Sequence, residues 1–249
     1  MSPVTVIPAD ATDLHAPRAR SPLAGAAVAI AVAAVVIGLA LSLGVAWWLG
    51  PVAAIAVAAG AWSLGVRPRV RAAEARVALL LGPTRPADGP AEARLLNLVE
   101  GLAPGAGLAR PPVLMIDDPA PNALAFGRDA RRGCLVATTG LVATLDRMQL
   151  EAVVAQLLVS LRDGLTAAPT VALAFRPGRV PVAAAPGAAD GAAVTLTRYP
   201  PALAGALRLL GGAGPAVPPG AAQVLAPLWF APPGDTIGLA ARIEDLEGR

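Results

Sequence analysis

The most regular pattern of apolar residues in the chain follows Asp146. Asp146 is a good N-cap residue, and Gln149 stands three positions later, as a capping box requires. Gly164 lies where a glycine commonly ends a helix. Between them, six apolar residues recur at helical spacing and therefore share one face: Leu150, Val153, Val154, Leu157, Leu158 and Leu161. We predict a helix from Asp146 to Gly164 whose apolar face nucleates the core of a folded domain.

A longer apolar stretch, residues 22–66, contains no charged residue. One membrane span needs about 20 apolar residues, so this length predicts a transmembrane hairpin with helices at about 22–43 and 51–66. Residues 1–21 are polar and are interpreted as a tail, and residues 67–249 form the remaining domain. The lipid bilayer is thus the first expected partner.

The orientation of this hairpin follows from its flanking arginines. Arg18 and Arg20 precede the first predicted span, Arg67 and Arg69 follow the second, and the turn between the spans has no basic residue. Because basic loops stay on the cytoplasmic side, the N-terminus and the C-terminal domain are both predicted to be cytoplasmic, in a multi-pass protein of the cell membrane.

Patterns after residue 67 predict an α+β fold that is mostly helical, with a small sheet. Ala123–Phe126 is expected to be an edge strand. Two segments rich in alanine, proline and glycine, 167–193 and 211–219, are expected to be loop-like. The other expected elements are strands at 111–117 and 134–139 and helices at 67–81, 91–102, 201–210 and 235–247.

The composition is typical of a membrane protein, and it excludes several classes of partner and catalytic site. The chain is 55% hydrophobic and only 15% charged, against about 25% charged residues in an average soluble domain. A net charge of +3 is too small to indicate a nucleic-acid partner. The single cysteine, Cys134, opens an apolar strand and is expected to be a buried, inert thiol. The only histidine is His15, so no catalytic or metal site in the domain can use histidine.

Adjacent carboxylates at Asp117 and Asp118 are the remaining acidic candidate. Neighbours on a strand point to opposite faces, so a catalytic pair is disfavoured and a turn at a strand end is the preferred interpretation. A hard-cation site that adds Asp129 stays open as an alternative, although the spacing matches no known calcium loop.

Four pieces of the chain together resemble the HtpX-like family of bacterial, membrane-anchored zinc metalloendopeptidases. These pieces are RLLNLVEGLAPGAGLARPPVLMIDDPAPNALAFGRD (94–129), LVATTGLVATLDRMQLEAVVA (135–155), LTRYPPALAGALRLL (196–210) and LAARIEDLE (239–247). The resemblance implies a zincin-like peptidase domain after the membrane hairpin.

The resemblance also implies where a zinc site would lie. In the family, two histidines and a glutamate of an H-E-x-x-H helix hold zinc and activate its water, and a later glutamate completes the site. Those positions read Gln156, Leu157 and Ser160 here, and less securely Ala188, while Asp190 keeps the family's residue type. Gln156 and Ser160 are expected to face solvent or to bond each other. We therefore predict no zinc and no catalytic residue.

Asn122, Ala123, Leu124 and Ala125 match the family piece that lines the substrate groove, and the backbone of an edge strand can pair with a peptide without any catalytic group. The leading hypothesis is a catalytically inactive pseudoprotease that binds a membrane protein, a peptide or an active relative. One alternative is a structural small membrane protein that has lost its groove. The other is an active membrane zinc metalloendopeptidase, which is disfavoured because the ligands and the base are missing.

Overall fold

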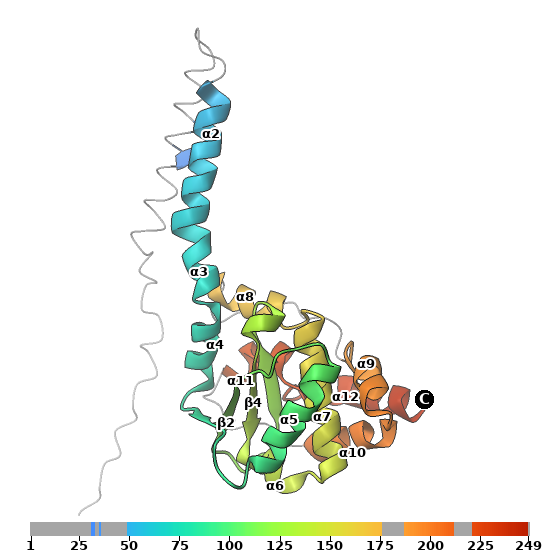
Figure 1. Ribbon diagram of the computed structural model, residues 1–249. Coiled ribbons are helices and arrows are strands. Elements are labelled where there is room, and N and C mark those ends of the chain that lie inside the picture. The colour runs from blue at the N-terminus through green and yellow to red at the C-terminus, as the bar shows by residue number, and fades with distance from the viewer. Residues whose placement is uncertain (1–30, 33–34, 36–48, 176–186, 212–220, 249) are drawn as a thin grey trace, which may run out of the picture. The chain divides into compact units, whose positions relative to one another are not determined.

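The structure is a computed structural model that describes residues 31–32, 35, 49–175, 187–211 and 221–248 (Figure 1). Contacts divide the chain into two units, residues 1–68 and 69–249, and each is considered by itself.

In the N-terminal unit, helix α2 (Leu49–Gly60) is followed by a π-helical stretch, η1 (Ala61–Val66). Large apolar side chains of both elements are exposed, with Ile55 of α2 at 69% and Leu64 of η1 at 84%. Of the described helices, none alone combines the length and the apolar composition of a membrane span; only α7 (Arg147–Arg162) and α8 (Ala167–Phe175), bent at 66°, pass together. The predicted span at 22–43 lies almost wholly outside the described residues, so the hairpin stays a prediction.

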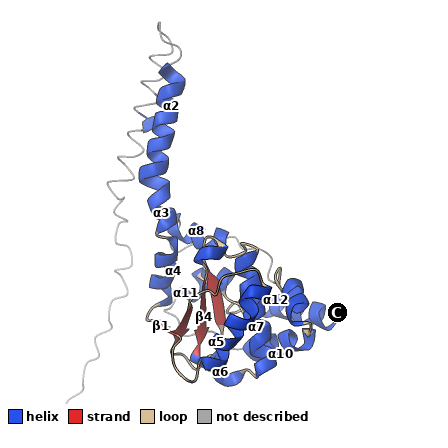
Figure 2. Cartoon of the chain, in the orientation of Figure 1, coloured by secondary structure: helices blue, strands red, loops and turns tan. Residues whose placement is uncertain are grey.

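The C-terminal unit contains a four-stranded mixed sheet in the order β1-β2-β4-β3 (Figure 2). Strand β2 pairs in parallel with β4, while β1 pairs with β2 and β3 with β4 in antiparallel register. The predicted mostly helical α+β fold with a small sheet is therefore confirmed. The strands are β1 (Arg85–Pro86), β2 (Val113–Ile116), β3 (Ala123–Phe126) and β4 (Cys134–Thr138).

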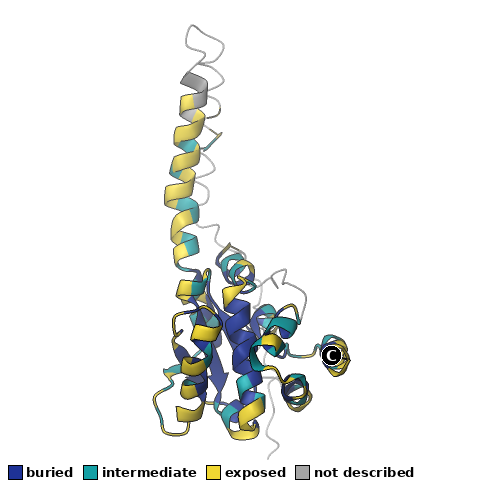
Figure 3. Ribbon diagram, turned by 45° about the vertical axis from the view of Figure 1, so that its right-hand side comes forward, coloured by how far each residue is buried: buried dark blue, intermediate teal, exposed yellow. Residues whose placement is uncertain are grey.

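Alternate side chains of the sheet enter two separate apolar cores. Met115, Ala125 and Leu135 pack with α5 (Ala93–Gly105) and α7, whereas Ile116 and Val136 pack with α4 (Ala73–Leu81) and α8. The period of two along each strand dictates this division, because successive side chains point to opposite faces. The sheet is thus the middle layer of the unit, and β3 and β4 are buried along their whole length, as the dark blue strands in Figure 3 show.

Helix α7 has the predicted ends. The Asp146 carboxylate accepts from the Gln149 amide at 2.8 Å, and the Gln149 side chain accepts from the Asp146 amide at 3.1 Å, which completes a capping box. Gly164 adopts φ +70°, and the Leu165 amide donates to the Ser160 carbonyl oxygen at 3.0 Å, as in a Schellman motif.

The prediction of one buried face on α7 was too narrow. Residues 152–161 of this helix are all buried, including Gln156 and Ser160. The sheet covers one side, and α5, α9 (Asp190–Thr197) and α10 (Pro200–Leu210) cover the others. A helix that is enclosed on every side buries small and polar residues together with its apolar stripe.

The prediction that 167–193 is loop-like was wrong for two parts of it, since α8 and the start of α9 are helical. Alanine favours the helix, and Leu173 of α8 is buried in the core beside α4. Packing therefore stabilises a helix in a segment whose composition is typical of a loop. Residues 176–186 and nearly all of 211–219 lie outside the described residues. The remaining elements are α3 (Arg67–Arg71), η2 (Ala130–Arg132), α6 (Thr139–Thr144), α11 (Ala221–Val224), η3 (Ala226–Leu228) and α12 (Thr236–Glu247).

Candidate functional site

One cavity brings together all four positions at which the family resemblance places zinc ligands and base. Its volume is about 80 Å³, and Gln156, Leu157 and Ser160 of α7 line it together with Ala188. Other lining residues are Trp229 and its neighbours in the segment 226–232, which follows α11, and Arg242 of α12. Segments that lie between Gln156 and Arg242 and are separated in the sequence therefore converge on one small space beside the central helix.

Of the two alternatives predicted for Gln156 and Ser160, exposure to solvent is wrong, whereas a hydrogen bond between the two residues is present. Gln156 is 8% and Ser160 9% exposed. The Ser160 hydroxyl donates to the backbone carbonyl oxygen of Gln156 at 2.9 Å, and not to the Gln156 side chain. Within the described residues, neither Oε1 of Gln156 nor Nε1 of Trp229 has a hydrogen-bond partner, although both atoms are buried.

This donor set does not fit zinc. Zinc in proteins is held by thiolate, imidazole or carboxylate groups, and among the described residues that line the cavity none carries one. An amide and a hydroxyl one helical turn apart are poor substitutes, and Leu157 and Ala188 have no donor atom at all. Across the described chain, no three His, Cys, Asp or Glu side chains form a group that could hold a metal ion.

A buried ion pair fixes the wall opposite α7. Arg242 donates to both carboxylate oxygens of Asp190, from Nε at 2.8 Å and from Nη2 at 2.9 Å. Its Nη1 donates to the carbonyl oxygen of Phe230 at 2.6 Å, and the guanidinium lies 5.1 Å from the centre of the Phe230 ring. Asp190 therefore has a structural partner, which the sequence did not assign.

A signal for this pair was present in the sequence. Leu239, Ile243 and Leu246 form the apolar stripe of α12, and Arg242 lies at the same helical spacing, within that stripe. A charged residue on a buried face needs a partner of opposite charge. Asp190, singled out only through the family resemblance, is that partner.

The β3 edge is occupied by the chain's own segment Trp229–Ala231. The Phe230 amide donates to the Ala123 carbonyl oxygen at 2.8 Å, and Trp229 forms an antiparallel bridge with Leu124. The Asn122 side chain donates from Nδ2 to the Ala231 carbonyl oxygen at 2.7 Å. All four predicted groove residues, 122–125, are accordingly buried.

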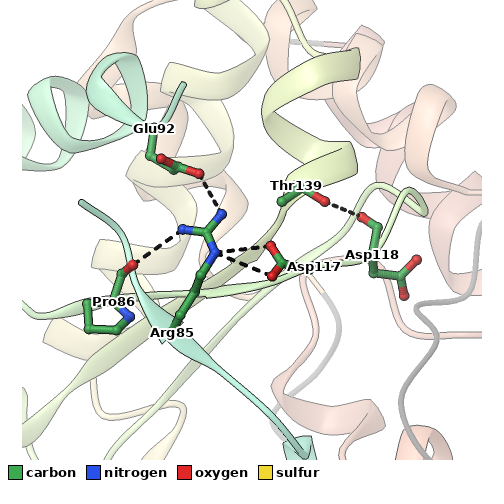
Figure 4. A network of polar contacts seen from close by, with 6 residues as sticks. All are labelled: Arg85, Pro86, Glu92, Asp117, Asp118 and Thr139. Atoms are coloured by element: carbon green, nitrogen blue, oxygen red, sulfur yellow. Dashed lines mark hydrogen bonds and ion pairs between the residues drawn. The ribbon is translucent and has the colours of Figure 1, made fainter. Parts of the chain in front are cut away.

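Asp117 and Asp118 do not form a pair. Arg85 bridges Asp117 and Glu92, with Nε 3.1 Å from Asp117 Oδ1 and Nη2 2.8 Å from Glu92 Oε1 (Figure 4). The hydrogen bond from Arg85 lowers the pKa of Glu92 below its ordinary value of 4.5. Asp118 accepts from the amide of Ala120 at 2.8 Å, as the turn interpretation requires.

The third member of the alternative cation site, Asp129, caps η2 by accepting from the amides of Arg131 and Arg132. The three carboxylates thus have separate structural partners. Cys134 is buried, as expected, and burial raises its pKa to about 12. A thiol with so high a pKa is a poor nucleophile at neutral pH.

Comparison with known proteins finds a match to peptidase family M48 over residues 90–155. The chain is similar to the "Protease HtpX homolog" of Acidiphilium cryptum, with 34% identity over 143 residues, which cover 57% of this chain and 50% of that protein. It is 51% identical over 61 residues to that of Dictyoglomus thermophilum, covering 24% and 20%. With that of Tropheryma whipplei, 44% identity over 80 residues covers 32% and 28%.

These matches confirm the predicted resemblance to the HtpX-like family. The chain spans between a fifth and half of the length of these curated relatives. No solved structure matches the chain. The matched M48 segment includes β2, β3 and β4 and ends at Ala155, immediately before Gln156.

Proposed function

We propose that this chain, an HtpX-like relative of the M48 peptidases, is a non-catalytic member that binds a peptide or membrane protein instead of cutting it. The observation that carries the proposal is the wall of the α7 cavity. Gln156, Leu157, Ser160 and Ala188 meet there, and the described residues around them supply neither a zinc ligand nor a general base.

The charged groups nearest this cavity support the same conclusion. Arg242 lines it, but its guanidinium is engaged by Asp190 and by the Phe230 carbonyl oxygen. Asp190 is 2% exposed and holds Arg242 with both oxygens, so its carboxylate is not offered to a water or a metal. Peptide hydrolysis would therefore need groups that this wall does not provide.

Binding at residues 122–125 has a condition that the sequence alone did not reveal. An external peptide can pair with the β3 edge only after Trp229–Ala231 leaves it, because the Phe230 amide already uses the Ala123 carbonyl oxygen. The covered edge is the specific observation in favour of the second candidate, a structural membrane protein without a retained groove.

Membrane attachment belongs to the proposal as well. The uncharged stretch 22–66 supports a multi-pass anchor with the domain on the cytoplasmic side, according to the flanking arginines. The exposed apolar side chains at Ile55 and Leu64 agree with lipid contact. Deletion of residues 22–66 should move the protein from the membrane pellet to the supernatant after carbonate extraction.

Metal content tests the absence of catalysis directly. The full chain, purified in detergent without chelators, should contain far less than one zinc per chain by mass spectrometry of the metal. It should leave unfolded casein intact under conditions in which an active M48 peptidase digests it. Stoichiometric zinc, or casein cleavage that a chelator abolishes, would refute the proposal.

Photo-crosslinking separates a binder from a structural protein. A photoreactive residue at Ala226, a half-buried position on the cavity wall, should capture a defined partner in cells. The matched control is the same residue at Ile237, which is 84% exposed and does not line the cavity. Equal capture from both positions would favour the structural candidate.

A further inference from the structure

The cavity beside α7 has two polar groups that the fold leaves unused. Oε1 of Gln156 and Nε1 of Trp229 are buried and, within the described residues, have no hydrogen-bond partner. A buried polar group without a partner destabilises the fold, so such groups are kept satisfied in almost all native structures. Both residues line the same cavity, and a ligand bound there is the simplest source of the missing bonds.

The side chain of Gln156 is suited to this purpose. It is more than nine-tenths buried, and the Ser160 hydroxyl bonds to its backbone, not to its amide. Rotation about the last bond of the side chain exchanges the carbonyl oxygen and the NH₂ group. Gln156 can therefore accept from a ligand or donate to it, as the ligand requires.

The charge of the cavity limits the ligand to a neutral group. Arg242 is the one charged residue among the described residues that line it, and both of its Asp190-facing nitrogens and Nη1 are engaged. A free anion would find no cation that is not already paired, and a free cation would find no carboxylate that is not already bound to Arg242. The desolvation of either would go uncompensated.

Size limits the ligand further. The cavity volume of about 80 Å³ exceeds the 10–15 Å³ or so that a single water requires. Leu157, Leu228 and Phe230 provide apolar surface next to the two polar groups. A group with one donor, one acceptor and a short apolar stem matches this wall.

We propose that the cavity lined by Gln156, Ser160 and Trp229 binds a small neutral carboxamide, as carried by an asparagine or glutamine side chain of a partner. The Trp229 indole donates to the carboxamide oxygen, and the Gln156 side chain exchanges hydrogen bonds with the carboxamide. The inference rests on the proposed function only in taking a peptide as the source of this group.

Acetamide is the probe, and the indole N–H signal of Trp229 is the readout. The chain has four tryptophans, of which Trp229 alone lies after residue 68, and Trp229→Phe identifies its signal in the ¹⁵N-labelled full chain. Acetamide should shift that signal saturably. Acetate and methylammonium, of similar size but charged, should not.

The variant Gln156→Leu keeps the size of the side chain and removes its amide, and it should weaken acetamide binding by about tenfold or more. The matched control is Gln223→Leu, at an exposed position that does not line the cavity, which should bind acetamide as the wild type does.

An unshifted Trp229 signal in the wild type, an equal response to acetate, or equal binding by the two leucine variants would each overturn the inference. The wild-type titration alone remains decisive if a variant does not fold. Zinc content and crosslinking test the proposed function separately, so the failure of one proposal is distinguishable from the failure of the other.

Discussion

At the scale of single residues, the Asp190–Arg242 pair governs the wall of the cavity. Both side chains are almost fully buried, at 3% and 5% exposed. Removal of one charge leaves the other buried and unpaired, which is costly. Removal of both charges leaves no unpaired charge in the core. The position of Phe230 depends on the same guanidinium.

Asp190→Ala should therefore lower the free energy of unfolding by about 3–5 kcal/mol, and the double variant Asp190→Leu, Arg242→Met should recover most of that loss. Denaturant titration followed by tryptophan fluorescence measures both. Arg162→Ala, which breaks an exposed pair with Asp163, should cost less than about 1 kcal/mol. A double variant as unstable as the single one would contradict the role of the pair.

Glu92 gives a prediction about pH. Its pKa is lower in the folded chain than its ordinary value of 4.5, chiefly because Arg85 donates a hydrogen bond to it. Below pH 4.5 the unfolded chain binds more protons at this group, so stability from Glu92 is complete above that pH and is lost as pH falls through the folded pKa. Glu92→Gln should flatten the dependence of stability on pH below about 4.5.

Denaturation midpoints measured between neutral pH and pH 3 would show this flattening. Arg85→Met should reproduce it, because the same hydrogen bond is removed. Glu100→Gln, at an exposed carboxylate, is the control and should retain the wild-type slope. An unchanged slope in both the Glu92 and the Arg85 variants would show that the contact does not contribute in solution.

Residue identity was predictable where one short motif decides it. Asp146, Gln149 and Gly164 were assigned their capping roles from spacing alone, and all three have them. The pairing of Asp190 with Arg242 required two segments 52 residues apart to meet, which no local pattern encodes. The position of Arg242 within the apolar stripe of α12 indicated that it needs a partner of opposite charge, but it did not identify that partner.

At the scale of elements, the two ends of α7 are stabilised in different ways. The N-terminus needs a side chain, and the C-terminus needs a backbone angle. Gly164 has φ +70°, and a Cβ added there would meet no atom within 4 Å. A substitution at this position therefore tests backbone strain without steric contact.

Gly164→Ala should lower the free energy of unfolding by about 1 kcal/mol, because residues other than glycine are strained in the left-handed region. Gly101→Ala is the matched change inside α5, where an added Cβ also meets nothing, and should raise it by about 0.5–1 kcal/mol through helix propensity. Thermal or denaturant unfolding of the two variants beside the wild type gives the comparison. The same sign of effect at both sites would refute the assignment of the cap.

Element positions were predictable where apolar periodicity is strong, as in β3, which has the predicted bounds 123–126. The periodicity of α7 indicated only its most apolar face, because alanine, serine and glutamine carry little signal about the helices that enclose them. Helix α8 was missed since its proline, alanine and glycine surroundings resemble a loop, and its burial depends on α4, which is distant in sequence.

At the scale of the whole domain, the central fact is that residues 229–231 complete the β3 edge. The interaction joins Asn122 to Ala231 across 109 positions of sequence, so the resemblance of 122–125 to a groove strand could not reveal it. Whether the edge can open decides between a binding protein and a structural one. The side chain of Asn122 holds the end of that segment, with Nδ2 2.7 Å from the Ala231 carbonyl oxygen.

Asn122→Ala should let residues 229–231 separate from β3 more often, because it removes hydrogen bonds that are buried on both sides. Loss of about 1–3 kcal/mol locally corresponds to amide exchange about ten- to a hundredfold faster at Phe230. Hydrogen-exchange mass spectrometry should show this acceleration in peptides covering 225–231 and unchanged protection in α7. Asn97→Ala, at an exposed position on α5, is the matched control. If Asn122→Ala leaves exchange at 229–231 unchanged, the segment is held by its backbone and by Arg242 alone. Acceleration together with stronger crosslinking from Ala226 would instead identify the opened β3 edge as the binding surface.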